Sequence, residues 1–186
     1  MHNAEALALR AAARKLSATD FQGTVRAYYP YWDTQYRPML LQAVEALPAS
    51  QFQFKPHPAL LTAHQTILHI AEAERAWMHC IVNRAGEVEE WVVPHEDPSR
   101  GLVTTYDAPD HAALLRELDQ WHRLTQAWLD KPDSELTRVI DYQPPGLDPR
   151  TYTLHWILDH LQEHEIHHRA QLNLYLRTMG VDPPSI

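Results

Sequence analysis

Apolar residues recur every three or four positions in four long segments of the chain, and proline-containing stretches separate these segments. Such spacing places apolar side chains on one face of an α-helix. It predicts helices over residues 29–46, 59–83, 109–130 and 151–179. Pro30 and Pro38 lie in the first of these segments and disfavour regular helix in its early turns.

Residues near the ends of these segments suggest where the helices begin and end. Pro58 suits the first position of the second helix, and Gly86 falls just beyond its end. Thr151 or Thr153 is a candidate cap for the last helix, and Gly180 is a candidate stop.

The remaining segments add little regular structure. Residues 3–16 predict a short additional helix, 87–108 form a long connection, and 131–150 form a loop in which Val139–Tyr142 is a candidate extended piece. We find no convincing β-hairpin or βαβ pattern. The expected fold is therefore all-α, a four-helix bundle with an extra short N-terminal helix, in a single domain over residues 1–186 whose extension is 1–18.

Composition narrows the possible functions. The net charge of -8 argues against a nucleic-acid partner, which normally needs a basic face. No segment approaches the roughly 20 apolar residues of a membrane span, and the N-terminus does not resemble a signal peptide. The expected location is the cytoplasm. Cys80 is the single cysteine, so an internal disulfide or a cysteine-rich zinc site is excluded.

Histidine is the strongest compositional bias, with 13 in the chain. His160, His164 and His168 follow one another at four-residue steps, which places them on one helix face. Two such imidazoles can bind one metal ion, but another helix must supply a third ligand. His69 is a candidate because its neighbours are apolar, and His64 and His122 are alternatives. The alternative interpretation of the run is a solvated polar face on the last helix. Apolar residues of the same helix lie near this stripe and argue against that alternative: Leu154, Ile157, Leu161, Leu172 and Tyr175.

These segments resemble a known protein family. Ile67-Leu-His-Ile-Ala-Glu-Ala-Glu-Arg-Ala-Trp77 together with His160-Leu-Gln-Glu-His-Glu-Ile-His-His-Arg-Ala-Gln171 is similar to the DinB/YfiT-like superfamily of metal-binding four-helix bundles, over about residues 27–180. The resemblance implies that His69, His164 and His168 are metal ligands and that His160 is not. It also implies a homodimer. Ala170 departs from the pattern, in which glycine is common.

The resemblance also suggests a chemistry. Three histidines leave coordination positions open, as in catalytic sites, and suit zinc, nickel, iron or copper. Relatives include metal-dependent S-transferases and isomerases that act with a low-molecular-weight thiol, which implies a small-molecule substrate here. His160, Glu72, Glu165 and Gln171 are candidates for orienting the ligands.

Two other functions remain open from the sequence. One is a non-catalytic metal-binding or interaction protein, which a fourth protein ligand such as His64, His122 or His160 would favour. The other is a metal-dependent hydrolase with Glu72 or Glu165 as the base. A di-iron carboxylate site is disfavoured, because only Glu165-Ile-His-His168 matches the required Glu-x-x-His pattern.

Overall fold

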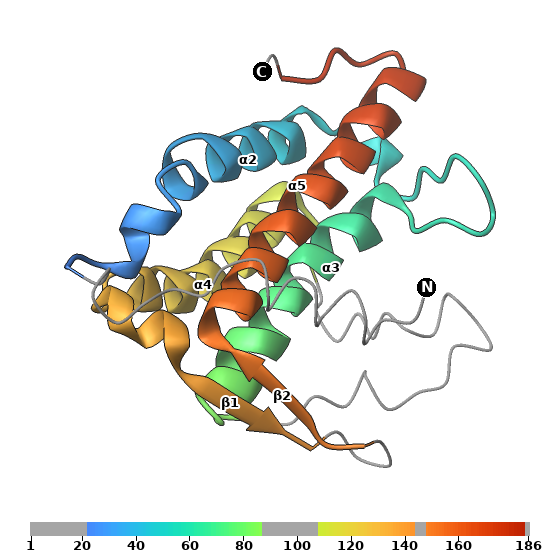
Figure 1. The fold of residues 1–186 in the computed structure, drawn as a ribbon. Coiled ribbons are helices and arrows are strands. Elements are labelled where there is room, and N and C mark those ends of the chain that lie inside the picture. Colours follow the sequence, from blue (N-terminus) through green and yellow to red (C-terminus); the bar gives the residue numbers. More distant parts are fainter. Residues whose placement is uncertain (1–21, 87–107, 144–147, 185–186) are drawn as a thin grey trace, which may run out of the picture.

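The computed structural model describes residues 22–86, 108–143 and 148–184 and shows a four-helix bundle (Figure 1). This confirms the predicted all-α fold. The predicted helix over 3–16 and nearly all of the 87–108 connection lie outside the described residues. The long helical elements are α2 (Arg37–Ala46), α3 (Ala63–Glu74) with its π-helical continuation η4 (Arg75–Val82), α4 (His111–Leu129) and α5 (Leu154–Thr178).

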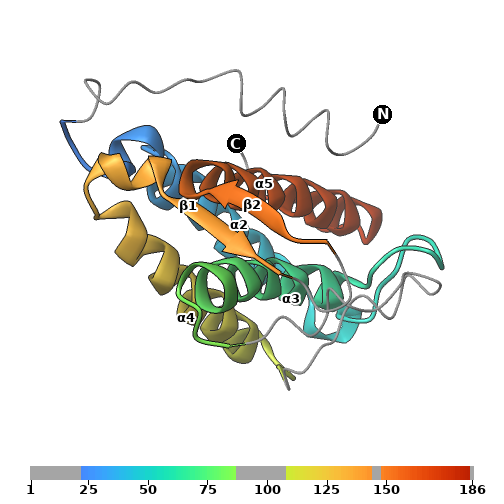
Figure 2. The ribbon, with the colours of Figure 1, turned by 60° about the horizontal axis from the view of Figure 1, so that its bottom comes forward.

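The helices pack in a closed arrangement. Helix α3 packs against α4 and α5, and α2 packs against the same two helices (Figure 2). The second and last predicted helices are therefore direct neighbours, as a shared metal site requires. Within the described part of the chain, no helix combines the length and apolar character needed to cross a membrane.

Hydrogen-bonded caps define where three of the helices begin. Thr62 and Gln65 form a reciprocal capping box at the start of α3, so the predicted start at Pro58 was wrong. The Asp110 side chain accepts a hydrogen bond from the Ala113 amide at the start of α4. At α5, the Thr153 side chain accepts a hydrogen bond from the Trp156 amide, so Thr153 and not Thr151 is the cap.

The chain before α2 is helical but irregular. It forms a 3-10 helix, η1 (Val25–Tyr28), and a π-helix, η2 (Trp32–Tyr36), which leads directly into α2. Pro38 is the second residue of α2, and as a proline it cannot donate a backbone hydrogen bond to the preceding π-helical turn. The expected irregularity of these turns is confirmed.

A small β-hairpin precedes the last helix. After the short 3-10 helix η6 (Asp133–Thr137), strand β1 (Val139–Tyr142) pairs antiparallel with β2 (Arg150–Thr153). The extended piece predicted over Val139–Tyr142 is confirmed. The expectation of no hairpin was wrong, because each strand has only four residues with few buried side chains, too short for a clear alternating pattern.

The buried core contains two apolar clusters with polar side chains between them. Members of one cluster include Trp32, Trp77, Leu129 and Leu161. Members of the other include Leu40, Ile67, Leu118 and Leu172. Along the sequence, several buried polar residues lie between members of the two clusters. The ones that we call the polar layer are Arg37, Glu74, His122, Thr125 and Glu165.

Candidate metal centre

The structure brings His69 of α3 together with His164 and His168 of α5. One ligand atom from each of the three side chains lies within 4.8 Å of the other two. The Nε2 atoms of His69 and His164 are 3.0 Å apart. All three residues are half-buried. Three nitrogen donors converging at this distance can hold a divalent ion.

The three imidazoles are held in their neutral form. Burial lowers the pKa of His69 to about 4, and repulsion from His168 and His160 adds to the effect. Burial and the neighbouring histidines also lower the pKa of His164 far below its usual range. The pKa of His168 is lowered as well, mainly by burial. A metal ion binds neutral imidazole, so protons compete little with a metal ion for these nitrogens near neutral pH.

Gln171 sets the orientation of His168. The Gln171 Oε1 atom lies 2.8 Å from Nδ1 of His168. A carbonyl oxygen only accepts, so Nδ1 must carry the proton and Nε2 is left with the free lone pair. The Gln171 amide nitrogen lies 3.0 Å from Nε2 of His167, to which it can donate. This is the pattern by which a neighbouring side chain fixes a ligand's tautomer.

The other histidines considered from the sequence have different contacts. His160 stacks on Trp156, with ring centroids 5.1 Å apart and planes 5° apart. Its ring centroid lies 5.9 Å from that of His164. Nε2 of His64 lies 2.7 Å from the carbonyl oxygen of Ala108. His122 belongs to the polar layer.

The two glutamates considered from the sequence are both buried, at 8% exposure for Glu72 and 2% for Glu165. Glu72 lies on α3, three residues after His69. Glu165 accepts hydrogen bonds from Arg37 at 2.7 Å and from Trp32 at 3.2 Å. The carboxylate of Glu165 is therefore held by residues from the segment of η2 and α2.

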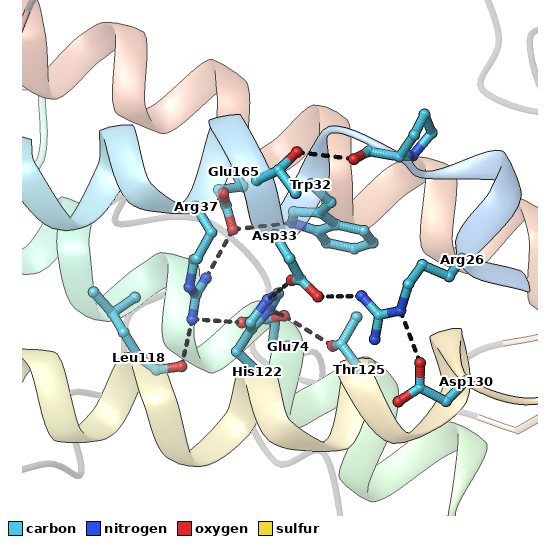
Figure 3. Close-up of polar contacts among 12 residues, drawn as sticks. Arg26, Trp32, Asp33, Arg37, Glu74, Leu118, His122, Thr125, Asp130 and Glu165 are labelled. Carbon is cyan, nitrogen blue, oxygen red and sulfur yellow. Dashed lines mark hydrogen bonds and ion pairs between the residues drawn. The ribbon is translucent and has the colours of Figure 1, made fainter.

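Sequence reasoning missed the charge network of the polar layer (Figure 3). His122 lies 2.7 Å from Glu74 through Nδ1 and 2.7 Å from Asp33 through Nε2. Burial alone would lower the pKa of His122, but these two carboxylates outweigh it and raise the pKa to about 9. The hydrogen bond from His122 in turn lowers the pKa of Asp33. His122 is thus a buried cation between two carboxylates.

A sequence signal for this network existed. Arg37 precedes Leu40 by three residues, and Glu165 follows Leu161 by four, so both charges fall on apolar helix faces. A charge on such a face needs a buried partner of opposite sign. Spacing within one helix does not identify that partner, which comes from another helix.

Comparison with known proteins agrees with this fold. The sequence profile of the DinB family matches residues 19–186, and the chain belongs to this family. A DinB-like protein from Bacillus cereus ATCC 10987 has a similar fold, with a TM-score of 0.57 and 17% identity over 88% of this chain and 97% of that chain. A DinB-like protein from Bacillus subtilis has a TM-score of 0.57 and 19% identity over 81% of this chain and 91% of that chain. No curated protein sequence matched the chain.

Proposed function

We propose that this protein binds one divalent metal ion through His69, His164 and His168 and acts as a metal-dependent enzyme on a small thiol. The observation that carries the proposal is the convergence of the three imidazoles, whose ligand atoms lie within 4.8 Å of one another. An all-nitrogen donor set suits zinc, nickel or iron. It would be unusual for magnesium or calcium, which prefer oxygen ligands.

The residues of the chain prepare this site in three ways. Helix α5 presents His164 and His168 one turn apart on the same face, and α3 presents His69 opposite them. Burial keeps the rings neutral and ready to bind. Gln171 accepts a hydrogen bond from Nδ1 of His168, which leaves Nε2 of His168 unprotonated. A bound divalent ion would stabilise a thiolate or lower the pKa of a water molecule.

Three protein ligands favour a catalytic site over a closed structural one. Structural zinc sites have four protein ligands, whereas catalytic sites leave a position for water or substrate. The histidines considered as a fourth ligand have other contacts: His64 with Ala108, His160 with Trp156, and His122 with Glu74 and Asp33. These contacts support an enzyme.

The choice of a thiol over a metal-bound water rests on two grounds. Family resemblance implies thiol-dependent transfer or isomerisation. In addition, Glu165, one of two candidate bases for a hydrolase, is held by Arg37 at 2.7 Å and by Trp32. Both donors contact the Oε2 atom of Glu165, which they hold within the polar layer.

Metal analysis tests the first half of the proposal. We expect about one divalent ion per chain in the untagged wild-type protein and a large loss of that ion in His168→Ala, since a three-ligand site loses a ligand. His57→Ala is the control, because His57 is exposed and lies outside the three-histidine group. Equal metal content in wild type and His168→Ala would refute the site.

An activity screen tests the second half. Metal-loaded protein is incubated with glutathione or N-acetylcysteine and a chromogenic aryl halide, and the S-aryl product is measured. We expect turnover that needs the metal and is lost in His168→Ala. Ester hydrolysis without any thiol would identify a hydrolase instead. Metal binding with no turnover of either kind would favour a non-catalytic metal protein.

A further inference from the structure

A single buried arginine contacts the other three helices of the bundle. Arg37 of α2 is 5% exposed. Its Nη1 atom lies 2.7 Å from Glu165 of α5, and its Nη2 atom lies 3.1 Å from Glu74 of α3. Nη2 also donates to the backbone carbonyl of Leu118 on α4 (Figure 3). Arg37 therefore connects α3 to α5, the two helices that carry the candidate metal ligands.

Both carboxylates that Arg37 contacts are fixed relative to a metal ligand by helix geometry. Glu165 directly follows His164, and Glu74 is the fifth residue after His69. Each residue of an α-helix turns by about 100° and rises by about 1.5 Å. A shift or rotation that moves either carboxylate must consequently move the imidazole on the same helix.

Other donors hold each carboxylate in place. Glu74 Oε1 accepts a hydrogen bond from Thr125 at 2.8 Å and lies 2.7 Å from Nδ1 of His122. Glu165 Oε2 accepts from Trp32 as well as from Arg37. The guanidinium group is planar, and its N–H donors have fixed directions. When Glu74 and Glu165 both contact it, the distance between α3 and α5 is therefore restricted to one value.

Stability alone does not account for this arrangement. Removing two carboxylates and a guanidinium from water is costly, and replacing such buried ion pairs by neutral side chains of similar size is often neutral or stabilising. The polar layer also separates two clusters of buried apolar side chains, so it replaces apolar contacts in the middle of the core. A geometric role fits a network that connects ligand-bearing helices.

We propose that Arg37 is a positioning residue for the metal centre: by joining Glu74 to Glu165 it sets the spacing and rotation of α3 and α5 at which His69 meets His164 and His168. This inference rests on the proposed metal site. It assigns to Arg37 a role that acts through the two glutamates, without contact with the ion or the substrate.

The test uses three variants of the full chain. Arg37→Met removes the bridge. The triple variant Arg37→Met, Glu74→Gln, Glu165→Gln removes it without leaving an uncompensated buried charge. Arg37→Lys keeps the charge but lacks the planar guanidinium group. The matched control is Asp33→Asn, which changes the same network at His122 and Arg26, residues of α4 and η1. For each protein, Zn²⁺ affinity is measured by chelator competition, the Co²⁺ absorption spectrum is recorded, and Tm is determined.

We expect wild type and Asp33→Asn to bind Zn²⁺ equally and to share one Co²⁺ spectrum, even where Asp33→Asn lowers Tm. The triple variant should bind Zn²⁺ about 10–100-fold more weakly, with a changed Co²⁺ spectrum, as is typical when residues supporting metal ligands are removed. Arg37→Lys should lie between them, and it provides the test if neither Met variant folds.

Two outcomes would overturn the role of Arg37 while leaving the metal site intact. One is a folded triple variant, or failing that Arg37→Lys, with wild-type affinity and spectrum. The other is a loss of affinity that follows Tm across all variants, the Asp33→Asn control included, which would reduce Arg37 to general stability. A wild-type protein that binds no Zn²⁺ or Co²⁺ would instead refute the proposed function itself.

Discussion

Gln171 accepts a hydrogen bond from Nδ1 of His168 at 2.8 Å, one turn further along α5. This contact determines which nitrogen of His168 is free to bind a metal. Gln171→Leu removes the acceptor while keeping a side chain of similar size. We expect metal affinity to fall about 10–100-fold, since the ring loses its preferred tautomer and orientation. Chelator competition with Zn²⁺ measures the change.

Gln120→Leu is the control for that substitution. Gln120 is exposed on α4, so the same change of side chain should leave Zn²⁺ affinity at the wild-type value. Wild-type affinity in Gln171→Leu would show that the orientation of His168 does not depend on this hydrogen bond.

His160 provides a test of how many histidines the site uses. Its ring stacks on Trp156 with planes 5° apart, and it lies outside the three-histidine group. His160→Phe keeps an aromatic ring on Trp156 and removes both nitrogens. We expect one ion per chain to remain bound, in contrast to His164→Ala. Loss of the ion from His160→Phe, measured by elemental analysis after dialysis, would point to a site with four histidines.

The fold was largely predictable because its signals are local. The four helices follow from the 3.6-residue period of apolar positions, and α4 extends over His111–Leu129 within the predicted 109–130. The convergence of His164 and His168 follows from their spacing of four. The hairpin was missed because its strands are short, and its pairing of Val139 with Thr153 depends on residues 14 positions apart.

Contacts between helices were harder to predict. His122 was considered as a metal ligand, yet it lies between Glu74 and Asp33, because two carboxylates from other elements outweigh the cost of burying its charge. Glu165 was considered as a neighbour of the ligands, and its carboxylate contacts Arg37. In both cases the residue type suggested a polar partner, but only the packing of α4 against α3 and of α2 against α5 identified it.

The start of α3 depends on Thr62. Its hydroxyl accepts a hydrogen bond from the Gln65 amide, and the Gln65 side chain accepts one from the Thr62 amide. Thr62→Ala should lower the free energy of unfolding by about 1 kcal/mol, the usual cost of losing such a cap. Urea unfolding measures it. Thr178→Ala at the exposed end of α5 should have a smaller effect, and an equal effect would argue against the capping role.

His122 should make the stability of the metal-free protein decline in alkaline solution. Its pKa is raised from 6.5 to about 9 in the folded protein. The proton is therefore bound more tightly by the folded than by the unfolded chain, and this contribution is complete below about pH 6.5. It is lost as the pH rises through about 9. The free energy of unfolding should fall by at most roughly 1.4 kcal/mol per pH unit in this interval.

His122→Gln tests this assignment, because it removes the titrating group and keeps a side chain that can donate a hydrogen bond. We expect it to be less stable than wild type at pH 6.5, with a flatter decline towards pH 9, in urea unfolding with a chelator present. His57→Gln, at an exposed histidine, should follow the wild-type curve. The Glu74 and Asp33 carboxylates are the groups that hold the proton on His122. If the free energy of unfolding instead declines with pH in parallel for wild type and His122→Gln, His122 is neutral in the folded protein and the assignment is wrong.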